Sequence, residues 1–197
     1  MVAPIGVFLC ASVTFGYNKP MQKPANNADV FKYCPKCGAA ALRFVKSNKL
    51  VCDACSFEFY HNTAVAVVAI ITNDKGQLLF VERGRQPSIG MLDFPGGFAD
   101  HDESAENTVI REIKEELDLD VTSLEYFCSE PNNCYEYKSV IYKTVDFAYI
   151  CKVADLSKAK PADDAKAILF ISPDEVDTEK IAFDSTKNIL AHYLCSL

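Results

Sequence analysis

Three glutamates, Glu112, Glu115 and Glu116, are spaced so that their carboxylates could share one ligand. Side chains three and four residues apart meet on one face of a helix, where like charges repel one another. A hard divalent cation such as Mg²⁺ or Mn²⁺ takes oxygen ligands, so it would stabilise this cluster and bridge it to substrate phosphates. A solvated acidic helix face is the plainer alternative. Arg111 among the acids and the rigid 95–97 turn before them favour the cation site.

The element that must position these acids is a helix predicted to start after Ser104, whose hydroxyl suits an N-cap. Its core face is an apolar stripe at helical spacing, made of Ala105, Val109, Ile110, Ile113 and Leu117. At about 100° per residue the glutamates fall on the adjoining stripe. The sequence therefore predicts a helix that holds the acids at the rim of a hydrophobic core.

The stretch from Gly97 to Leu119 resembles the Nudix box, G-x5-E-x7-R-E-U-x-E-E-x-G-U, and every fixed position but one matches. The exception is Asp118, where the family has glycine at the end of the helix. Glycine there suits a left-handed turn, and Asp is among the residues that best tolerate this conformation after glycine. The resemblance implies a Nudix hydrolase of the α/β class, an α/β/α sandwich with a mixed sheet.

The resemblance implies a divalent-cation-dependent enzyme that hydrolyses pyrophosphates. It also implies a role in that reaction for each of several residues. The ligands of one to three Mg²⁺ or Mn²⁺ ions would be Glu112, Glu115, Glu116 and the Gly97 carbonyl. Arg111 would orient the carboxylates by bidentate pairing, and Glu103 would support the geometry of loop and helix. The general base is left open. Its candidates are a box glutamate, Glu130, Asp163 and Asp164.

Four cysteines, Cys34, Cys37, Cys52 and Cys55, form two C-x2-C pairs separated by fourteen residues. Paired turns of this kind present four thiolates in a tetrahedron, the geometry of a structural Zn²⁺ site. Two disulfides or a redox pair are the alternatives, and a reducing cytosol disfavours the disulfides. The segment between the pairs predicts a hairpin with its turn at 47–48. These features resemble a zinc ribbon, and a ribbon before a Nudix domain resembles the NADH pyrophosphatase branch of the family.

Two arginines just ahead of the box are candidate phosphate ligands. Arg83 and Arg85 lie at the end of a predicted strand, and guanidinium groups suit bidentate binding of phosphate. The alternative is that both are solvated arginines without a role in binding.

Substrate choice must be read from the residues that follow the box. The NADH pyrophosphatase branch carries S-Q-P-W-P-F-P there, of which only Ser129 and Pro131 match, and this chain contains no Trp. Nicotinamide recognition by that motif is therefore not expected. A base could instead stack on Tyr135 or Tyr137. We expect a nucleoside diphosphate linked to another moiety, with ADP-ribose and NADH as the leading candidates.

The remaining patterns predict strands with a helix on each side. A β-branched run over 63–72 indicates a strand buried on both faces. A turn at 73–76 and a return strand over 77–83 would make a hairpin. The further predicted elements are strands over 124–129 and 140–153, a loop over 130–138 that overhangs the site, and a terminal helix over 184–194 with Asp184 as its N-cap.

The length of 197 residues suits one ordinary domain and a small module. We expect a flexible N-terminal extension over 1–28, a zinc ribbon over 29–60 and a Nudix hydrolase domain over 61–197. The first segment lacks the basic region of a secretory signal and is short for a membrane span. A disordered extension or a misread start codon is therefore preferred to a degenerate export or membrane-associating segment.

The net charge of -7 argues against a broad nucleic-acid surface. It does not argue against phosphate substrates, because bound cations reverse the local sign. We expect a cytoplasmic enzyme with a small-molecule partner, without nucleic acid or membrane, and leave a homodimer open. The alternative function is a ligand-binding regulator or scaffold that docks through the basic ribbon. The intact box carboxylates favour the enzyme.

Overall fold

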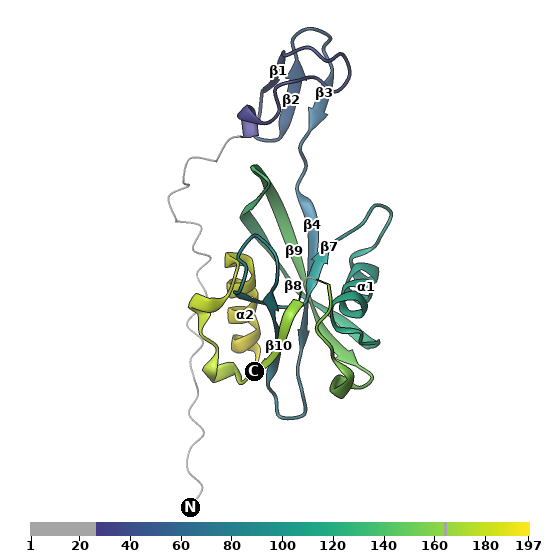
Figure 1. The fold of residues 1–197 in the computed structure, drawn as a ribbon, viewed down its shortest axis with the longest axis vertical. Coiled ribbons are helices and arrows are strands. Elements are labelled where there is room, and N and C mark those ends of the chain that lie inside the picture. Colours follow the sequence, from purple (N-terminus) through teal and green to yellow (C-terminus); the bar gives the residue numbers. More distant parts are fainter. Residues whose placement is uncertain (1–26, 164) are drawn as a thin grey trace, which may run out of the picture.

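The computed structural model describes residues 27–163 and 165–197 (Figure 1). Most of the predicted extension, and the candidate base Asp164, lie outside the described residues. The strands are β1 (Leu42–Phe44), β2 (Lys49–Cys52), β3 (Glu58–Tyr60), β4 (Ala64–Ile71), β5 (Leu78–Arg83), β6 (Leu92–Asp93), β7 (Gly96–Phe98), β8 (Val121–Tyr137), β9 (Val140–Val153) and β10 (Ala165–Ile171). The helices are α1 (Ala105–Leu117) and α2 (Asp184–Ser196), with 3₁₀ turns η1 (Asn27–Asp29), η2 (Leu156–Lys158), η3 (Pro173–Glu175) and η4 (Thr178–Lys180). In the described part of the chain, no helix is long and apolar enough to cross a bilayer.

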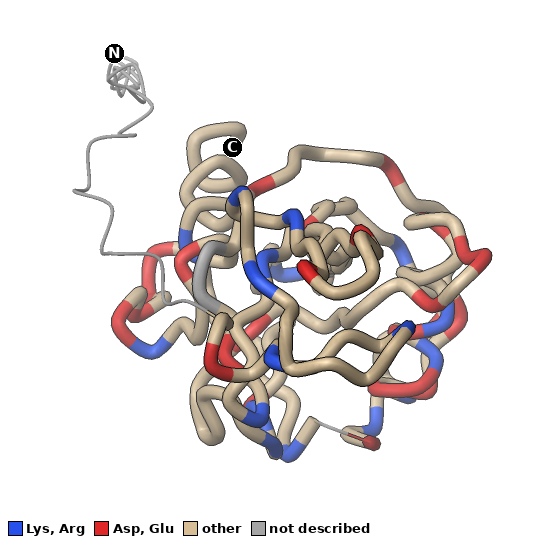
Figure 2. Tube along the Cα trace, turned by 90° about the horizontal axis from the view of Figure 1, so that it is seen from above, with Lys and Arg blue, Asp and Glu red and all other residues tan. Residues whose placement is uncertain are grey.

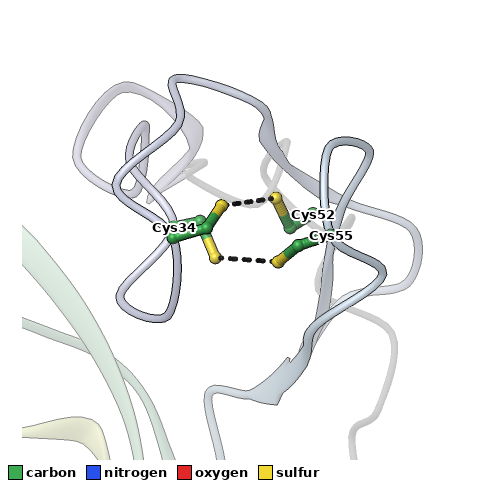
Figure 3. Close-up of side chains that lie close together, drawn as sticks. Cys34, Cys52 and Cys55 are labelled. Atoms are coloured by element: carbon green, nitrogen blue, oxygen red, sulfur yellow. Dashed lines mark hydrogen bonds between the residues drawn. The ribbon is translucent and has the colours of Figure 1, made fainter.

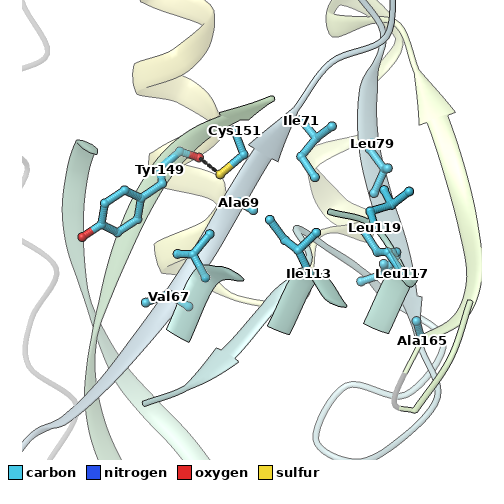
Figure 4. Close-up of a cluster of buried hydrophobic side chains, with 12 residues drawn as sticks. Val67, Ala69, Ile71, Leu79, Ile113, Leu117, Leu119, Tyr149, Cys151 and Ala165 are labelled. Atoms are coloured by element: carbon cyan, nitrogen blue, oxygen red, sulfur yellow. Dashed lines mark hydrogen bonds between the residues drawn. The ribbon is translucent and has the colours of Figure 1, made fainter. Parts of the chain in front are cut away.

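A mixed four-stranded sheet, in the order β7-β4-β9-β8, lies between α1 and α2 (Figure 1). β4 runs parallel to β9, and the other neighbours are antiparallel. Successive residues of β4 enter opposite cores, as expected for a strand covered on both faces. Those on the α1 side are Val67, Ala69 and Ile71, and those on the α2 side are Val68 and Ile70. Figure 4 shows the α1 core, where Ile113 and Leu117 pack near β4. The predicted α/β/α sandwich is confirmed.

The predicted hairpin of β4 and β5 is wrong, although its turn forms. Asn73 Oδ1 accepts hydrogen bonds from the backbone N–H groups of Lys75 (2.9 Å) and Gln77 (3.0 Å). After the bridge between Thr72 and Leu78 the strands separate. β5 joins a second sheet, in the order β10-β5-β6, while β4 pairs with β7 and β9. Local turn chemistry fixes where the chain reverses, but the partners of each strand are set by tertiary packing.

The predicted loop over 130–138 is also wrong, because β8 continues to Tyr137 and pairs with β9. β8 lies at one edge of the sheet, and it tolerates Pro131, which has no N–H to donate, because an edge strand needs ladder hydrogen bonds on one side only. The register shifts between Asn132 and Tyr135, as a bulge would make it do. The chain reverses later, at Lys138 and Ser139, where φ is 48° and 64°.

Helix α1 begins and ends as predicted. Ser104 Oγ accepts from the Asn107 N–H (3.2 Å), and Asp118 adopts the left-handed conformation with φ 54°. For α2 the predicted N-cap Asp184 is wrong by one residue, since Phe183 holds that position. The buried first-turn hydroxyls of α2 donate to carboxylates of the sheets, which fixes the start of the helix.

The strands β1, β2 and β3 form a small antiparallel sheet at one end of the molecule (Figure 1). The predicted turn between β1 and β2 is present, and the Val45 N–H donates across it to the Lys49 carbonyl (2.9 Å). Its small core consists of Cys34, Leu42, Leu50 and Cys52. A cysteine-bearing segment with its own sheet and small core thus precedes the sandwich. We refer to residues 29–60 as the ribbon.

Candidate active site

An open cleft of about 370 Å³ brings together residues from both halves of the sandwich. The first group comes from β7 and α1 and consists of Gly97, Arg111, Glu112, Glu115 and Glu116. The second group comes from β8, β9 and the segment before α2, and includes Asn132, Tyr135, Asp146 and Phe183. The predicted acidic cluster therefore faces the same cleft as one of the predicted stacking tyrosines.

The predicted turn over 95–97 is a bend at Pro95 followed by strand β7, whose two glycines lie close against neighbouring elements. Gly96 has a φ of 152°, and a Cβ there would overlap the Val67 carbonyl of β4. A Cβ on Gly97 would overlap the carboxylate of Glu112. The glycine pair thus lets the backbone of β7 lie against β4 and against the acidic helix at once. It places Gly97 beside Glu112, with which the sequence predicts a shared ligand.

Arg111 connects the acids of the cluster. Its Nε and Nη2 donate to Glu103 (3.0 and 2.9 Å), and its Nη1 donates to Glu112 (2.8 Å) and Glu115 (2.9 Å). Hydrogen bonding from Arg111 holds the pKa of Glu103 at about 2. Burial instead raises the pKa of Glu112, although the same arginine opposes the change. Acidic residues are frequent along this α1 side of the molecule (right in Figure 2), so Arg111 offsets part of a concentrated negative charge.

The donor set of the cluster fits a hard cation, because it consists of oxygen atoms. Glu116 is only 7% exposed, and its Oε2 accepts from the Gly96 N–H (3.0 Å). Within the described ranges, however, no three carboxylates bring their oxygens within 4.8 Å of one another. The reason is that Arg111 lies between Glu112 and Glu115. To share a cation with Glu116, these two side chains must turn away from the arginine.

The four cysteines converge in the ribbon (Figure 3). The Sγ atoms of Cys34 and Cys55 are 3.7 Å apart, as are those of Cys37 and Cys52, and all four lie within 4.8 Å of one another. A disulfide would need about 2.05 Å. A tetrahedron with Zn–S bonds of about 2.3 Å has edges of about 3.8 Å. Burial opposes ionisation of Cys34, but backbone N–H donors of residues 36 and 37 lower its pKa to about 7. The geometry fits a zinc ribbon.

The two predicted phosphate ligands lie near the acidic cluster. Arg83 lines the cleft, and its Nε donates to the Pro87 carbonyl (2.9 Å) and its Nη1 to Asp93 (3.2 Å). Its guanidinium also sits 4.8 Å from the ring centre of Phe183. Arg85 is mostly exposed, pairs with Asp163 (3.0 Å), and borders a small cavity next to Glu116. The reading of two solvated arginines is therefore wrong for Arg83.

The two predicted stacking tyrosines are placed differently. Tyr135 lines the cleft, with its ring centre 5.3 Å from that of Phe98 and 5.7 Å from that of Phe183. Tyr137 is 41% exposed near the β8–β9 turn, with Lys138 Nζ 5.2 Å from its ring. The structure thus brings Tyr135, and not Tyr137, to the cleft.

Of the candidate general bases Asp163 and Glu130, only Asp163 lies at the cleft. Asp163 lines the cleft and pairs with Arg85. Glu130 faces α2, where it contacts His192 Nε2 (3.0 Å) and accepts from Asn188 Nδ2 (3.1 Å), and it does not line the cleft. Outside the acidic cluster, Asp163 is the candidate that the described residues place at the site.

Sequence reasoning missed two buried carboxylates in the cleft. Asp93 is 7% exposed and accepts from Thr186 Oγ1 (2.8 Å), while Asp146 is 5% exposed and accepts from Thr144 Oγ1 (2.8 Å). Both line the cleft between the sheets and α2. A signal was available for Asp146, because it interrupts the apolar run of a strand, and buried acids occur almost only with polar partners.

Asp93 predicts a pH dependence of stability. Burial raises its pKa from 3.8 to about 6 against the opposing charge of Arg83. Since the folded state then binds the proton more tightly, stability is lost as the pH rises from about 4 through about 6, by about 3 kcal/mol at this shift. Urea unfolding at pH 4 and pH 7 should show a smaller loss for Asp93→Asn than for wild type. Asp74→Asn, at an exposed turn, is the matched control. Equal pH dependence in wild type and Asp93→Asn would contradict the assignment.

A sequence model of the NUDIX domain matches residues 62–193. Among curated proteins, the NAD-capped RNA hydrolase NudC of Pseudomonas fluorescens is 26% identical over 99 residues, which cover 50% of this chain and 35% of that protein. The human mitochondrial NAD(P)H pyrophosphatase NUDT13 is 32% identical over 104 residues, which cover 52% of this chain and 28% of that protein. The chain thus spans about a third of the length of these curated relatives.

Solved structures share the fold. A NUDIX hydrolase from Nitrosomonas europaea superposes with a TM-score of 0.60 at 22% identity, covering 84% of this chain and 91% of that one. The NUDIX domain of Shewanella oneidensis NrtR, complexed with ADP ribose, gives a TM-score of 0.52 at 23% identity, covering 69% of this chain and 90% of that one. At 22% and 23% sequence identity, these similarities show a shared fold and do not show a shared substrate.

Proposed function

Because the chain belongs to the NUDIX family, we propose that it hydrolyses the pyrophosphate of a nucleoside diphosphate linked to another moiety. The observation that carries this proposal is the placement of Glu112, Glu115 and Glu116 along the same cleft as Arg83 and Tyr135. Acids for a cation, an arginine for phosphate and a ring for a base are the three contacts that such a substrate requires.

In this proposal the acidic cluster and the Gly97 carbonyl hold Mg²⁺ or Mn²⁺. When bound, the cation would offset the negative charge of the diphosphate and lower the pKa of a water molecule, so that the general base removes its proton more easily as the water attacks phosphorus. Arg111 holds Glu112 and Glu115 beside the cleft through its Nη1, and both carboxylates would exchange this contact for the cation. Glu103 fixes Arg111 in turn by accepting hydrogen bonds from its Nε and Nη2. The four cysteines hold Zn²⁺ in a structural role, with no position left for substrate.

The substrate contacts follow from the cleft. Arg83 is oriented by Pro87 and Asp93, so its guanidinium is fixed before a phosphate arrives. Tyr135, with Phe98 and Phe183 beside it, offers ring surface for a base. Asp163 is the proposed general base outside the cluster, because it lines the cleft whereas Glu130 is engaged with α2. A phosphate that engages Arg85 would release the Asp163 carboxylate from its ion pair.

The test is a screen of nucleoside diphosphate derivatives with Mg²⁺ or Mn²⁺ that identifies the products. Hydrolysis of at least one would support the enzyme, and binding without hydrolysis across the screen would support the regulator or scaffold instead. A small-molecule partner without nucleic acid or membrane and a cytoplasmic location remain predictions, and a homodimer remains open.

We predict that ADP-ribose, or a related ADP-linked compound, is cleaved at least as efficiently as NADH. One curated relative is named an NAD(P)H pyrophosphatase, yet the loop motif of that branch is absent here and the cleft provides Tyr135 for a single stacked base. The measurement is kcat/KM for ADP-ribose and for NADH at equal Mg²⁺. A tenfold preference for NADH, about 1.4 kcal/mol, would contradict the prediction.

The matched pair Tyr135→Ala and Tyr137→Ala serves as the control for this comparison. Loss of one base stack costs about 1–3 kcal/mol in single-strand binders, so KM for Tyr135→Ala should rise about fivefold or more. Tyr137 lies outside the cleft lining, and its variant should match wild type.

A further inference from the structure

We propose that the ribbon positions the base-stacking side of the cleft, and that His61 is the positioning residue through which it does so. This inference rests on the proposed function, because it takes Tyr135 as the surface that receives the base. It concerns the end of the β8–β9 hairpin over residues 135–142, which we call the hairpin arm.

The hairpin arm extends beyond the main sheet. β4 pairs with β9 from Thr144 to Cys151, whereas β8 and β9 stay paired as far as Tyr137 and Val140. An isolated two-stranded hairpin is marginally stable in water. The register shift between Asn132 and Tyr135 interrupts the ladder just before Tyr135. The arm therefore needs another contact to hold the tyrosine in a fixed position.

Asn27, in the 3₁₀ turn η1 just before the ribbon, supplies the first such contact. Its Nδ2 donates to the Ile141 carbonyl (2.8 Å), and its Oδ1 accepts from the Ile141 N–H (2.8 Å). These are the two hydrogen bonds that a neighbouring strand would make, and Asn27 is only 8% exposed. The edge of β9 beyond β4 is thus held by a side chain that precedes the cysteine module.

A series of aromatic rings supplies the second contact and leads into the cleft. The ring centre of His61 lies 5.3 Å from that of Phe31 in the ribbon and 5.8 Å from that of Tyr142 in the arm. Tyr142 is the cross-strand partner of Tyr135, with 6.5 Å between their ring centres. Cross-strand aromatic pairs of this kind stabilise a sheet. Burial lowers the pKa of His61, which favours the neutral ring that packs as an aromatic group.

The four-cysteine cluster lies behind this series. Phe31 packs against the ribbon core that contains Cys34 and Cys52, and its ring centre is 6.2 Å from that of Phe44. The folding of the ribbon would be coupled to binding of its metal, so the metal would hold the ring of Phe31 in place. The ring of Phe31 in turn limits the movement of the His61 ring that packs against it. A ribbon that merely tethered an independent domain would leave ligand binding in the cleft unchanged when His61 is altered.

The experiment compares wild type, His61→Ala, His61→Phe and the adjacent control Tyr60→Ala. Tyr60 is 47% exposed and its ring contacts Lys49. The probes are AMP, which carries a base, and inorganic pyrophosphate, which carries none, each titrated by calorimetry with Mg²⁺. Zinc content is measured for every variant, and a value of about one per chain shows that the ribbon is intact.

We expect His61→Ala to weaken AMP binding about fivefold or more, the fold-change that about 1 kcal/mol gives, while pyrophosphate binding stays within about twofold. His61→Phe should restore AMP binding because it keeps the ring, and Tyr60→Ala should match wild type. Hydrogen exchange at the backbone amides of the hairpin arm should quicken in His61→Ala alone.

The inference is overturned if His61→Ala binds AMP like wild type, if both probes weaken equally, or if wild type binds no AMP. These binding constants require no turnover. A protein that binds AMP in a His61-dependent manner but cleaves no substrate would refute the proposed function and leave this inference standing.

Discussion

Glu116→Gln should lower kcat/KM by about 10²-fold or more while the protein stays folded. The carboxylate is buried against the Gly96 N–H, and the amide oxygen of glutamine can accept the same hydrogen bond at nearly the same volume. What the variant loses is the negative charge that would hold a cation. Removal of one strong electrostatic stabiliser costs about 10²–10³-fold in kcat in well-studied enzymes.

Glu115→Gln should have a similar effect for the same reason, although Glu115 is half exposed and paired with Arg111. An exposed i,i+4 pair contributes only about 0.3–0.5 kcal/mol, so its loss cannot unfold the protein. Glu106→Gln on the same helix is the matched control, because its carboxylate accepts from the Tyr149 hydroxyl and does not line the cleft. Activity of both Glu115→Gln and Glu116→Gln within threefold of wild type would remove the case for the cation site.

Local signals were sufficient for the elements that carry the chemistry. The Ser104 cap and the left-handed Asp118 follow from the side chain and backbone of the residue itself. The apolar stripe is confirmed except for Ile110, which is 43% exposed and packs in neither core. The two C-x2-C pairs likewise fix their own geometry within short turns, and the sulfurs meet as predicted. These features were readable because their determinants lie within a few residues of one another.

Predictions failed where distant partners decide. Pro131 and the asparagine pair after it suggest a loop, but an edge strand accepts a proline and a bulge absorbs an extra residue. β5 was assigned to β4 because the turn at Asn73 is strong, whereas its actual neighbours are β10 and β6. Asp93 went unnoticed because its partner Thr186 lies 93 residues away in the chain. Asp146 has a near partner in Thr144, but its second partner Ser185, which ties it to α2, lies 39 residues away.

Cys34→Ser should release the ribbon metal and unfold residues 29–60 while leaving the sandwich intact. Cys34 is 2% exposed in the small ribbon core, which contains few other large side chains. Such a core cannot stabilise a module of this size alone, and zinc-finger peptides draw roughly 10–16 kcal/mol from their metal. Zinc content should fall from about one per chain to near zero. Cys195→Ser, on α2 outside the cluster, is the matched control and should keep its zinc.

Hydrogen exchange separates this result from a general loss of stability. In Cys34→Ser the backbone amides of β1 and β2 should exchange at least about 100-fold faster than in wild type, because the free energy of local opening is then close to zero. The amides of β4 and α1 should keep their protection, since the cores around Val67 and Val68 share no residue with the ribbon core. The amides of residues 135–142 should lose part of theirs, because Asn27 and His61, which flank the ribbon, contact this hairpin. Full zinc retention in reduced Cys34→Ser, or uniform loss of protection across both modules, would show that the cysteine cluster does not organise the ribbon.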